Sequence, residues 1–111
     1  MSDPFDLQTR MLAAAPDLDL RFRKMFGGIM GYAGGTVFAS LSNVGLALKF
    51  NGTAHPNMLA VPGAVPLRYE PGDPPSKSYI VLPPDIVADN AALHECIVAS
   101  IDGLKPKPAK R

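Results

Sequence analysis

The chain has one cysteine among its 111 residues, and this scarcity excludes several kinds of site. The lone Cys96 cannot form an internal disulfide, and it cannot build a zinc or iron–sulfur site from several thiolates. The two histidines, His55 and His94, lie far apart in the sequence and match no metal-ligand spacing. We therefore expect no metal and no cofactor, and a reducing, cytoplasmic setting.

Long hydrophobic runs are also absent. No apolar stretch approaches the ~18 residues that a membrane helix requires. No basic segment followed by an apolar run begins the chain, so the sequence does not predict a signal peptide. We expect no membrane partner. The apolar content of 47% nevertheless provides enough material for the core of a single domain.

Positive charge is scarce outside the C-terminus. The net charge is +1, but four of the eleven basic residues lie in the last seven positions. Residues 1–104 hold seven basic and ten acidic residues, a net charge of −3, so they lack the strong positive field of a dedicated nucleic-acid-binding protein. We predict one domain over residues 1–104 and a disordered, solvated basic tail over residues 105–111.

Signatures of catalysis and of nucleotide binding are missing as well. The glycines of residues 28–34 do not have the spacing of a dinucleotide-binding turn, and no helix is predicted after them. His94 and Cys96 are two positions apart on a predicted helix, about 200° around its axis, so their side chains cannot meet. We expect Cys96 in the core, His94 on the flank of the helix, and His55 in a structural or exposed place. We expect no enzymatic activity.

Glycines divide the middle of the chain into short segments. Between residues 23 and 50 they separate apolar and β-branched runs, a pattern typical of consecutive antiparallel strands. Gly34-Gly35 marks the sharpest turn, because glycine adopts φ > 0 without steric cost. Residues 42–45 mark the next turn. The strand after it places alternate residues on one face: Leu46, Leu48 and Phe50.

In the N-terminal segment the spacing of apolar residues changes from that of a helix to that of a strand. Ser2 or Asp3 can cap a helix whose apolar stripe ends before Pro16. From Leu18 to Met25 apolar residues alternate with charged ones, which predicts a half-buried first strand.

Shorter elements and a long helix follow in the second half. We predict a short helix within residues 51–61, strands near residues 65–69 and 78–82, one helical turn at residues 84–87, and a helix ending near residue 104. Thr53 and Asp89 are the expected N-terminal caps of the short and the long helix, and Gly103 is the expected C-terminal cap. This order predicts an α+β domain whose antiparallel sheet carries its helices mainly on one face.

Basic and aromatic residues are interleaved along the predicted strands. Gathered on the outer face of the sheet, they would bind single-stranded nucleic acid or a protein partner. The alternative is an ordinary solvated face with the tyrosines half in the core. The partner-binding candidates are Arg23, Lys24, Tyr32, Lys49, Arg68, Tyr69 and Lys77.

The segment Arg23-Lys24-Met25-Phe26-Gly27-Gly28, with the glycine-bearing hairpin and the strand after it, resembles the N-terminal domain of the TfoX/Sxy competence regulators. Residues 66–69, 78–83 and 85–93 agree with that family in order. The resemblance covers roughly residues 10–104 and does not extend to the second, helical domain of the full regulators.

This resemblance implies a two-layer α+β fold with a five-stranded antiparallel sheet. It also implies a role in transcription of DNA-uptake genes, together with a cyclic-AMP receptor protein. We therefore expect a non-enzymatic regulatory domain that contacts a protein of the transcription machinery. The alternative is a small nucleic-acid-binding domain that uses the basic and aromatic sheet face and the tail. An exposed edge strand would also allow a homodimer.

Overall fold

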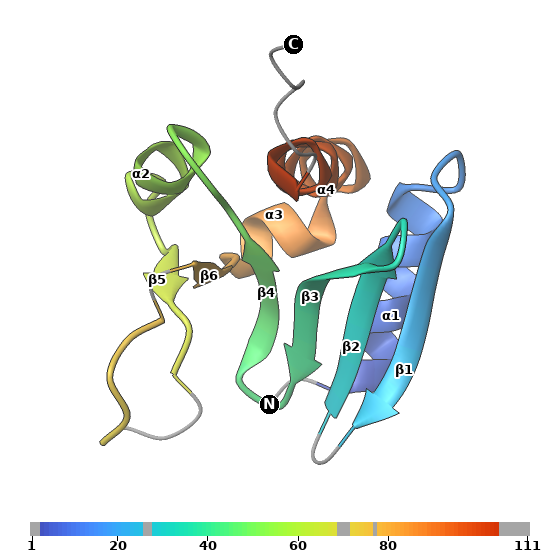
Figure 1. Ribbon diagram of the computed structural model, residues 1–111, viewed down its shortest axis with the longest axis horizontal. Helices are drawn as coiled ribbons and strands as arrows, with labels where there is room; N and C mark the ends of the chain where they lie inside the picture. Colours follow the sequence, from blue (N-terminus) through green and yellow to red (C-terminus); the bar gives the residue numbers. More distant parts are fainter. Residues whose placement is uncertain (1–2, 26–27, 69–71, 77, 105–111) are drawn as a thin grey trace, which may run out of the picture.

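The computed structural model describes residues 3–25, 28–68, 72–76 and 78–104, which form one antiparallel sheet and four helices (Figure 1). The strands are β1 (Leu20–Met25), β2 (Gly28–Ala33), β3 (Thr36–Ser42), β4 (Gly45–Lys49), β5 (Val65–Pro66) and β6 (Tyr79–Val81). The helices are α1 (Pro4–Ala14), α2 (Ala54–Leu59), α3 (Pro84–Ala88) and α4 (Asn90–Leu104). The predicted α+β fold is confirmed, and the predicted tail lies outside the described residues.

The sheet order is β1-β2-β3-β4-β6-β5, so six strands stand where about five were expected. The predicted turn between β2 and β3 is confirmed, because Gly34 and Gly35 both have positive φ angles, of 60° and 84°. Strand β6 lies between β4 and β5 and has a neighbour on each side, as its apolar sequence indicated. Strand β5, which was predicted near residues 65–69, is only two residues long.

Helix α1 begins and ends where the sequence predicts. The carboxylate Oδ1 of Asp3 accepts a hydrogen bond of 2.9 Å from the backbone nitrogen of Phe5, which caps the first turn. Leu7, Met11 and Ala14 form the buried stripe of the helix. Figure 1 shows α1 behind β1 and β2, on one side of the sheet.

Helix α4 confirms one predicted cap and corrects another. Asp89 Oδ1 accepts hydrogen bonds from the backbone nitrogens of Ala91 (3.0 Å) and Ala92 (3.3 Å). The prediction that Gly103 ends the helix is wrong, because the helix continues to Leu104. Gly103 is not among the positive-φ glycines, and its carbonyl accepts a 3.1 Å hydrogen bond from Asn51 Nδ2.

The cap predicted for α2 is confirmed in position but makes no side-chain hydrogen bond, since Thr53 is the N-cap residue. Thr53 already has helical angles, with φ −71° and ψ −18°, and its side chain makes no capping hydrogen bond. A side-chain N-cap normally requires extended angles at that residue. The short helix itself is confirmed over Ala54–Leu59.

The hydrophobic core lies between one face of the sheet and the helices. Leu7 and Met11 of α1 and Leu93 and Ile97 of α4 belong to the same buried cluster as residues of β2, β3, β4 and β6. Cys96 is in this cluster, as predicted. Since α4 also contacts α1 and α3, the helices form one layer and the sheet the other. We call the helix-covered side the inner face and the opposite side the outer face.

A β-bulge in β3 decides which residues of that strand reach the core. Gly31 pairs with Ala39 and Tyr32 with Val37, so Phe38 is an extra residue on β3. Both Phe38 and Ala39 are fully buried in the core cluster. Val37 and Ser40, on either side of this pair, therefore occupy the outer face.

Candidate functional site

One row of side chains crosses all six strands on the outer face. Strand pairing aligns its members from edge to edge: Arg23, Met30, Ser40, Ala47, Val81 and Val65. We call this set the outer row. Arg23 and Val65 at its two ends are exposed, whereas Ser40 and Ala47 in the middle are only 2% and 0% exposed. The centre of the outer face is therefore closed to solvent, and its ends are open.

Two further groups of paired residues place other aromatic and basic side chains on the outer face. Tyr32 pairs with Arg21 on one side and with Val37 on the other. Farther across the sheet Lys49 pairs with Tyr79. Of the predicted candidates, Arg23, Tyr32 and Lys49 thus lie on the outer face. Tyr32 and Lys49 are half-buried, and Arg23 is exposed.

The other predicted candidates are not gathered with these three. Lys24 lies on the inner side, because it pairs with the buried Ile29 and its Nζ stands 5.6 Å from the centre of the Phe5 ring. Neighbouring residues of a strand point to opposite faces, so Lys24 cannot share a face with Arg23. Arg68 follows β5 at the far edge, about 24 Å from β1 for six strands spaced ~4.8 Å apart. Tyr69 and Lys77 lie outside the described residues.

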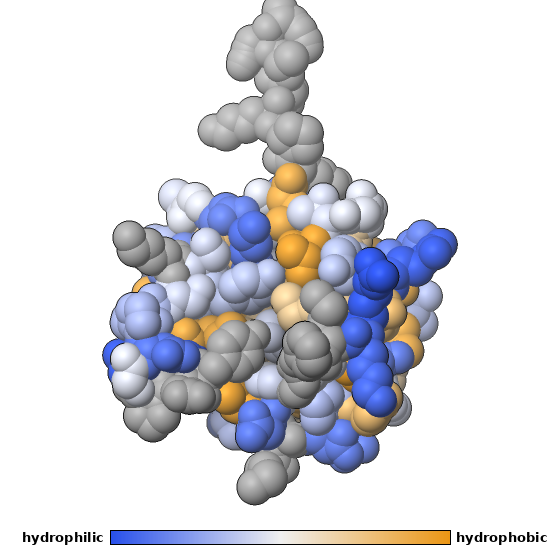
Figure 2. Space-filling model, turned by 60° about the horizontal axis from the view of Figure 1, so that its bottom comes forward, coloured by the Kyte–Doolittle hydropathy of each residue, from blue (hydrophilic) through white to orange (hydrophobic). Residues whose placement is uncertain are grey.

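Basic side chains concentrate at β1. Arg21 Nε donates to Asp19 Oδ1 at 3.3 Å, with side chains 78% and 83% exposed, so this ion pair adds little to stability. Within the described part of the chain Arg23 makes no ion pair. Figure 2 shows a column of hydrophilic side chains beside hydrophobic ones at the right of the molecule, the side on which Figure 1 places β1.

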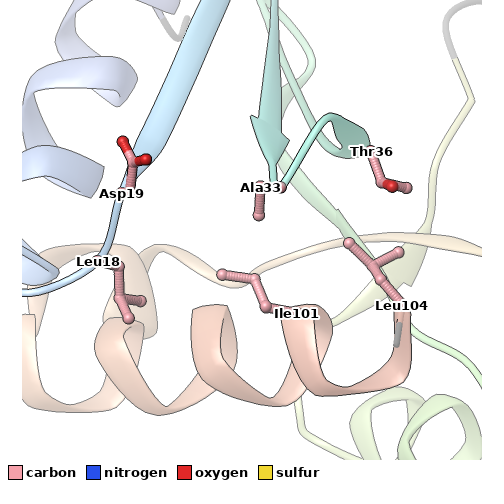
Figure 3. Close-up of a pocket in the computed structure, with 7 residues that line it drawn as sticks. Leu18, Asp19, Ala33, Thr36, Ile101 and Leu104 are labelled. Carbon is pink, nitrogen blue, oxygen red and sulfur yellow. The ribbon is translucent and has the colours of Figure 1, made fainter. Parts of the chain in front are cut away.

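A pocket of about 320 Å³ opens between the start of β1, the β2–β3 turn and the end of α4. Leu18, Ile101 and Leu104 point into it in Figure 3, with Ala33 above them. Thr36 and Asp19 are the polar residues of its lining. Such a lining suits a small apolar group and provides no pair of groups for acid–base chemistry.

Among the described residues no hydrogen bond joins the Cys96 thiol to His55 or His94. His94 lies on the flank of α4, as predicted, and its Nε2 is 3.2 Å from Asp17 Oδ1. Burial, and to a lesser extent the negative charge of Glu95, raise the pKa of the Cys96 thiol from 9.0 to about 11, which keeps it protonated near neutral pH. His55 on α2 is half-buried, and its Nε2 has no hydrogen-bond partner among the described residues.

Comparison with known families agrees with this geometry. The TfoX N-terminal domain model matches residues 12–104, from within α1 to the end of α4. The chain belongs to the TfoX N-terminal domain family. No curated relative and no solved structure was found to match it. Within its described residues this TfoX N-terminal domain holds no helix long and apolar enough to cross a membrane, and no cluster of three potential metal ligands.

The sequence reasoning missed most of the outer row of this TfoX N-terminal domain. Basic and aromatic residues were singled out by type, whereas the row is aligned by strand register. One signal was available in the sequence, because side chains of a strand alternate between the two faces of a sheet. On β1, residues separated from Arg23 by an even number of positions share its face. Register between β4 and β6, which are about 30 residues apart, has no comparable local signal. The missed members are Met30, Ser40, Ala47, Val81 and Val65.

Proposed function

We propose that this TfoX N-terminal domain is a non-enzymatic protein-interaction domain that takes part in regulating transcription. It binds a protein partner through the outer face of its sheet. The observation that carries the proposal is the outer face near β1, which combines the exposed Arg21 and Arg23 with the half-buried, uncharged side chains of Met30, Tyr32 and Val37 on the neighbouring strands. Uncharged interface centres surrounded by charged rims are typical of protein–protein contacts.

A protein partner fits this face better than single-stranded nucleic acid. Binding of single strands requires exposed aromatic platforms along a basic groove. On the outer face Tyr32 and Tyr79 are half-buried, and the basic side chains Arg21 and Arg23 stand together at one edge. The domain without its tail also carries a net charge of −3.

The non-enzymatic part of the proposal is supported by how the reactive side chains are used. Cys96 packs in the core with a raised pKa, which leaves little nucleophilic thiolate near neutral pH. The His94 imidazole contacts Asp17 on the surface. Transcription regulation, including a role in competence, rests on family membership, and a cytoplasmic location agrees with that role.

Affinity capture from the native host's lysate tests the proposal, with and without nuclease. We expect the wild-type domain to capture a transcription regulator or polymerase subunit that survives nuclease. The Arg23→Ala/Met30→Ala double variant should lose this capture. Arg10→Ala is the matched control, because Arg10 is an exposed basic residue on α1, away from the outer face.

Other outcomes would favour the alternative function or contradict the proposal. Capture that disappears with nuclease, and direct binding that falls steeply with salt, would favour nucleic-acid binding. Equal loss in the double variant and in Arg10→Ala would remove the outer face from the argument. Circular dichroism of each variant should first show an intact fold.

A further inference from the structure

We infer that the free edge of β1 receives an extended segment of a partner protein in which acidic residues alternate with apolar ones. The segment would add a seventh strand to the sheet beside β1. This inference rests on the proposed function and deepens it, because it states the chemistry of the partner.

The first observation is the backbone of β1. This strand is six residues long, about 20 Å, and lies at the end of the strand order. Within the described residues no strand pairs with it on the side away from β2. Every second residue of β1 therefore directs its N–H and C=O groups outward, where an added strand can pair with them.

The second observation is charge on the outer face. Arg21 and Arg23 occupy alternate positions of β1, so both stand on the outer side of the edge. Directly opposed charges of opposite sign stabilise a strand pair, and like charges destabilise it. An incoming strand with carboxylates on its outer side satisfies this requirement.

The third observation is exposed apolar surface on the inner side. Phe5 and Leu12 of α1 are 56% and 42% exposed. Arg10 faces the opposite way, since it lines a hollow with Val44 and Val87. Phe5 and Leu12 lie about 140° and 160° around the helix axis from Arg10.

These two apolar side chains therefore flank the sheet on the β1 side. Lys24 of β1 confirms this placement, because its Nζ stands over the Phe5 ring at 5.6 Å. A seventh strand about 4.8 Å beyond β1 would bring its inner side chains over the exposed flank of α1. Those inner side chains should accordingly be apolar. Together with carboxylates on the outer side, they give a strand in which acidic and apolar residues alternate.

The same charges disfavour a second copy of this chain as the occupant. Pairing β1 antiparallel with itself about Phe22 would place Arg21 opposite Arg23 of the copy on both sides of the centre, and pairing about Arg23 would place Arg23 opposite its own copy. The other edge of the sheet is a poor template, since β5 has two residues and one is Pro66, which has no N–H.

A synthetic peptide tests the inference directly. The probe is fluorescein-labelled Glu-Val-Glu-Leu-Glu-Val-Glu, with binding followed by fluorescence anisotropy against the full chain. Two control peptides are a block sequence of the same composition and the alternating peptide N-methylated at every second residue. We expect the alternating peptide to bind, and both controls to bind at least about tenfold more weakly, because the controls lose the alternation or the backbone donors. Amide exchange of alternate β1 residues should slow on binding.

Matched variants locate the site. Arg21→Glu/Arg23→Glu should weaken binding roughly tenfold or more, because two attractive cross-strand pairs become repulsive. Arg10→Glu carries a single charge reversal outside the site and should have a much smaller effect.

The apolar side of the site has its own pair of variants. Phe5→Ser/Leu12→Ser should weaken peptide binding about three- to tenfold, through loss of apolar contact. Val65→Ser changes an equally exposed apolar residue at the far edge and should leave binding unchanged.

Binding that is unaffected by N-methylation, or by reversal at Arg21 and Arg23, would overturn the inference. So would the absence of peptide binding, or a dimer in solution whose β1 amides are protected. In each of these cases a nuclease-resistant capture by the wild-type domain would leave the proposed function standing.

Discussion

Two rows of side chains cross the sheet one residue apart on every strand. They differ in what shields their central residues from solvent. The inner row comprises Phe22, Gly31, Ala39, Leu48, Ile80 and Pro66. Its neighbour on the opposite side is the outer row. In both rows the central residues are almost fully buried, but only the inner centre belongs to the core cluster with α1 and α4.

The difference shows that burial and membership of the core are separate properties. Leu48 and Ile80 are buried from solvent in the core beneath the helix layer. Ala47 and Ser40 are small residues that are buried from solvent outside that core. The inner row also contains Gly31, where an added Cβ would come within 3.3 Å of the Phe22 ring and 3.0 Å of Ala39 Cβ. Close packing thus extends to both faces of the sheet, and only the ends of the outer row remain accessible.

The largest expected effect contrasts the two rows directly. Leu48→Ala should lower the free energy of unfolding by about 2–5 kcal/mol, because it leaves a cavity under the helices. Val65→Ala, at the 50% exposed end of the outer row, should change it by less than about 0.5 kcal/mol. Urea denaturation measures both values. Equal losses in the two variants would contradict the distinction between the rows.

The next prediction tests whether the outer centre is as closed as its burial indicates. Ala47→Leu should cost about 1–3 kcal/mol, since the larger side chain has no free volume to enter. An open, solvated face would accept leucine with little change. A loss below about 0.5 kcal/mol in thermal or urea unfolding would show that the outer centre opens in solution.

An effect of similar size is expected at the polar contact between the two layers. Ser100 of α4 is fully buried, and its hydroxyl donates to the backbone oxygen of Lys49 at 2.5 Å. Ser100→Ala should cost about 1–3 kcal/mol, because the Lys49 carbonyl loses its buried donor. Ala99→Ser, one residue away on the exposed side of α4, is the control and should be nearly neutral. Two variants of equal stability would mean that water replaces the lost donor.

The smallest effect concerns pH. The folded protein keeps the Cys96 proton up to a pKa of about 11, whereas an ordinary thiol releases it near 9.0. Between these values the folded state binds more protons than the unfolded chain, so stability should fall as pH rises from 9 to 11. Cys96→Ala removes this contribution. The stability of the wild type relative to the variant should therefore decline across that window, and a constant difference would contradict the raised pKa.

The sequence predicts the elements that depend on local chemistry. Asp3 and Asp89 cap helices because their carboxylates reach nearby backbone nitrogens, and Gly34-Gly35 turns because both residues adopt positive φ. Gly103 was mistaken for a helix end because glycine usually marks one. Its carbonyl instead binds Asn51, a contact 52 residues distant in sequence that no local pattern contains.

The candidate site was less predictable than the fold. The opposite placement of Arg23 and Lys24 follows from strand alternation alone and was available from the sequence. The bulge at Phe38 was not available, because an extra residue in β3 is selected by packing against the helices. Pairing of β4 with β6 joins segments separated by α2 and β5, so the outer row emerges only from the assembled sheet.

Helix α4 follows every strand in the described part of the chain, and this order has a consequence for biosynthesis. The helix contacts β3 and β4, and its hydrogen bonds from Ser100 to Lys49 and from Asn51 to Gly103 join residues 51 and 52 positions apart. On a growing chain the part of the inner row beneath α4 would stay uncovered until α4 has been translated, so the nascent sheet is open to misassembly during that interval. A chain stopped at Asp89 should accordingly be degraded rapidly in limited proteolysis, whereas the full chain should resist.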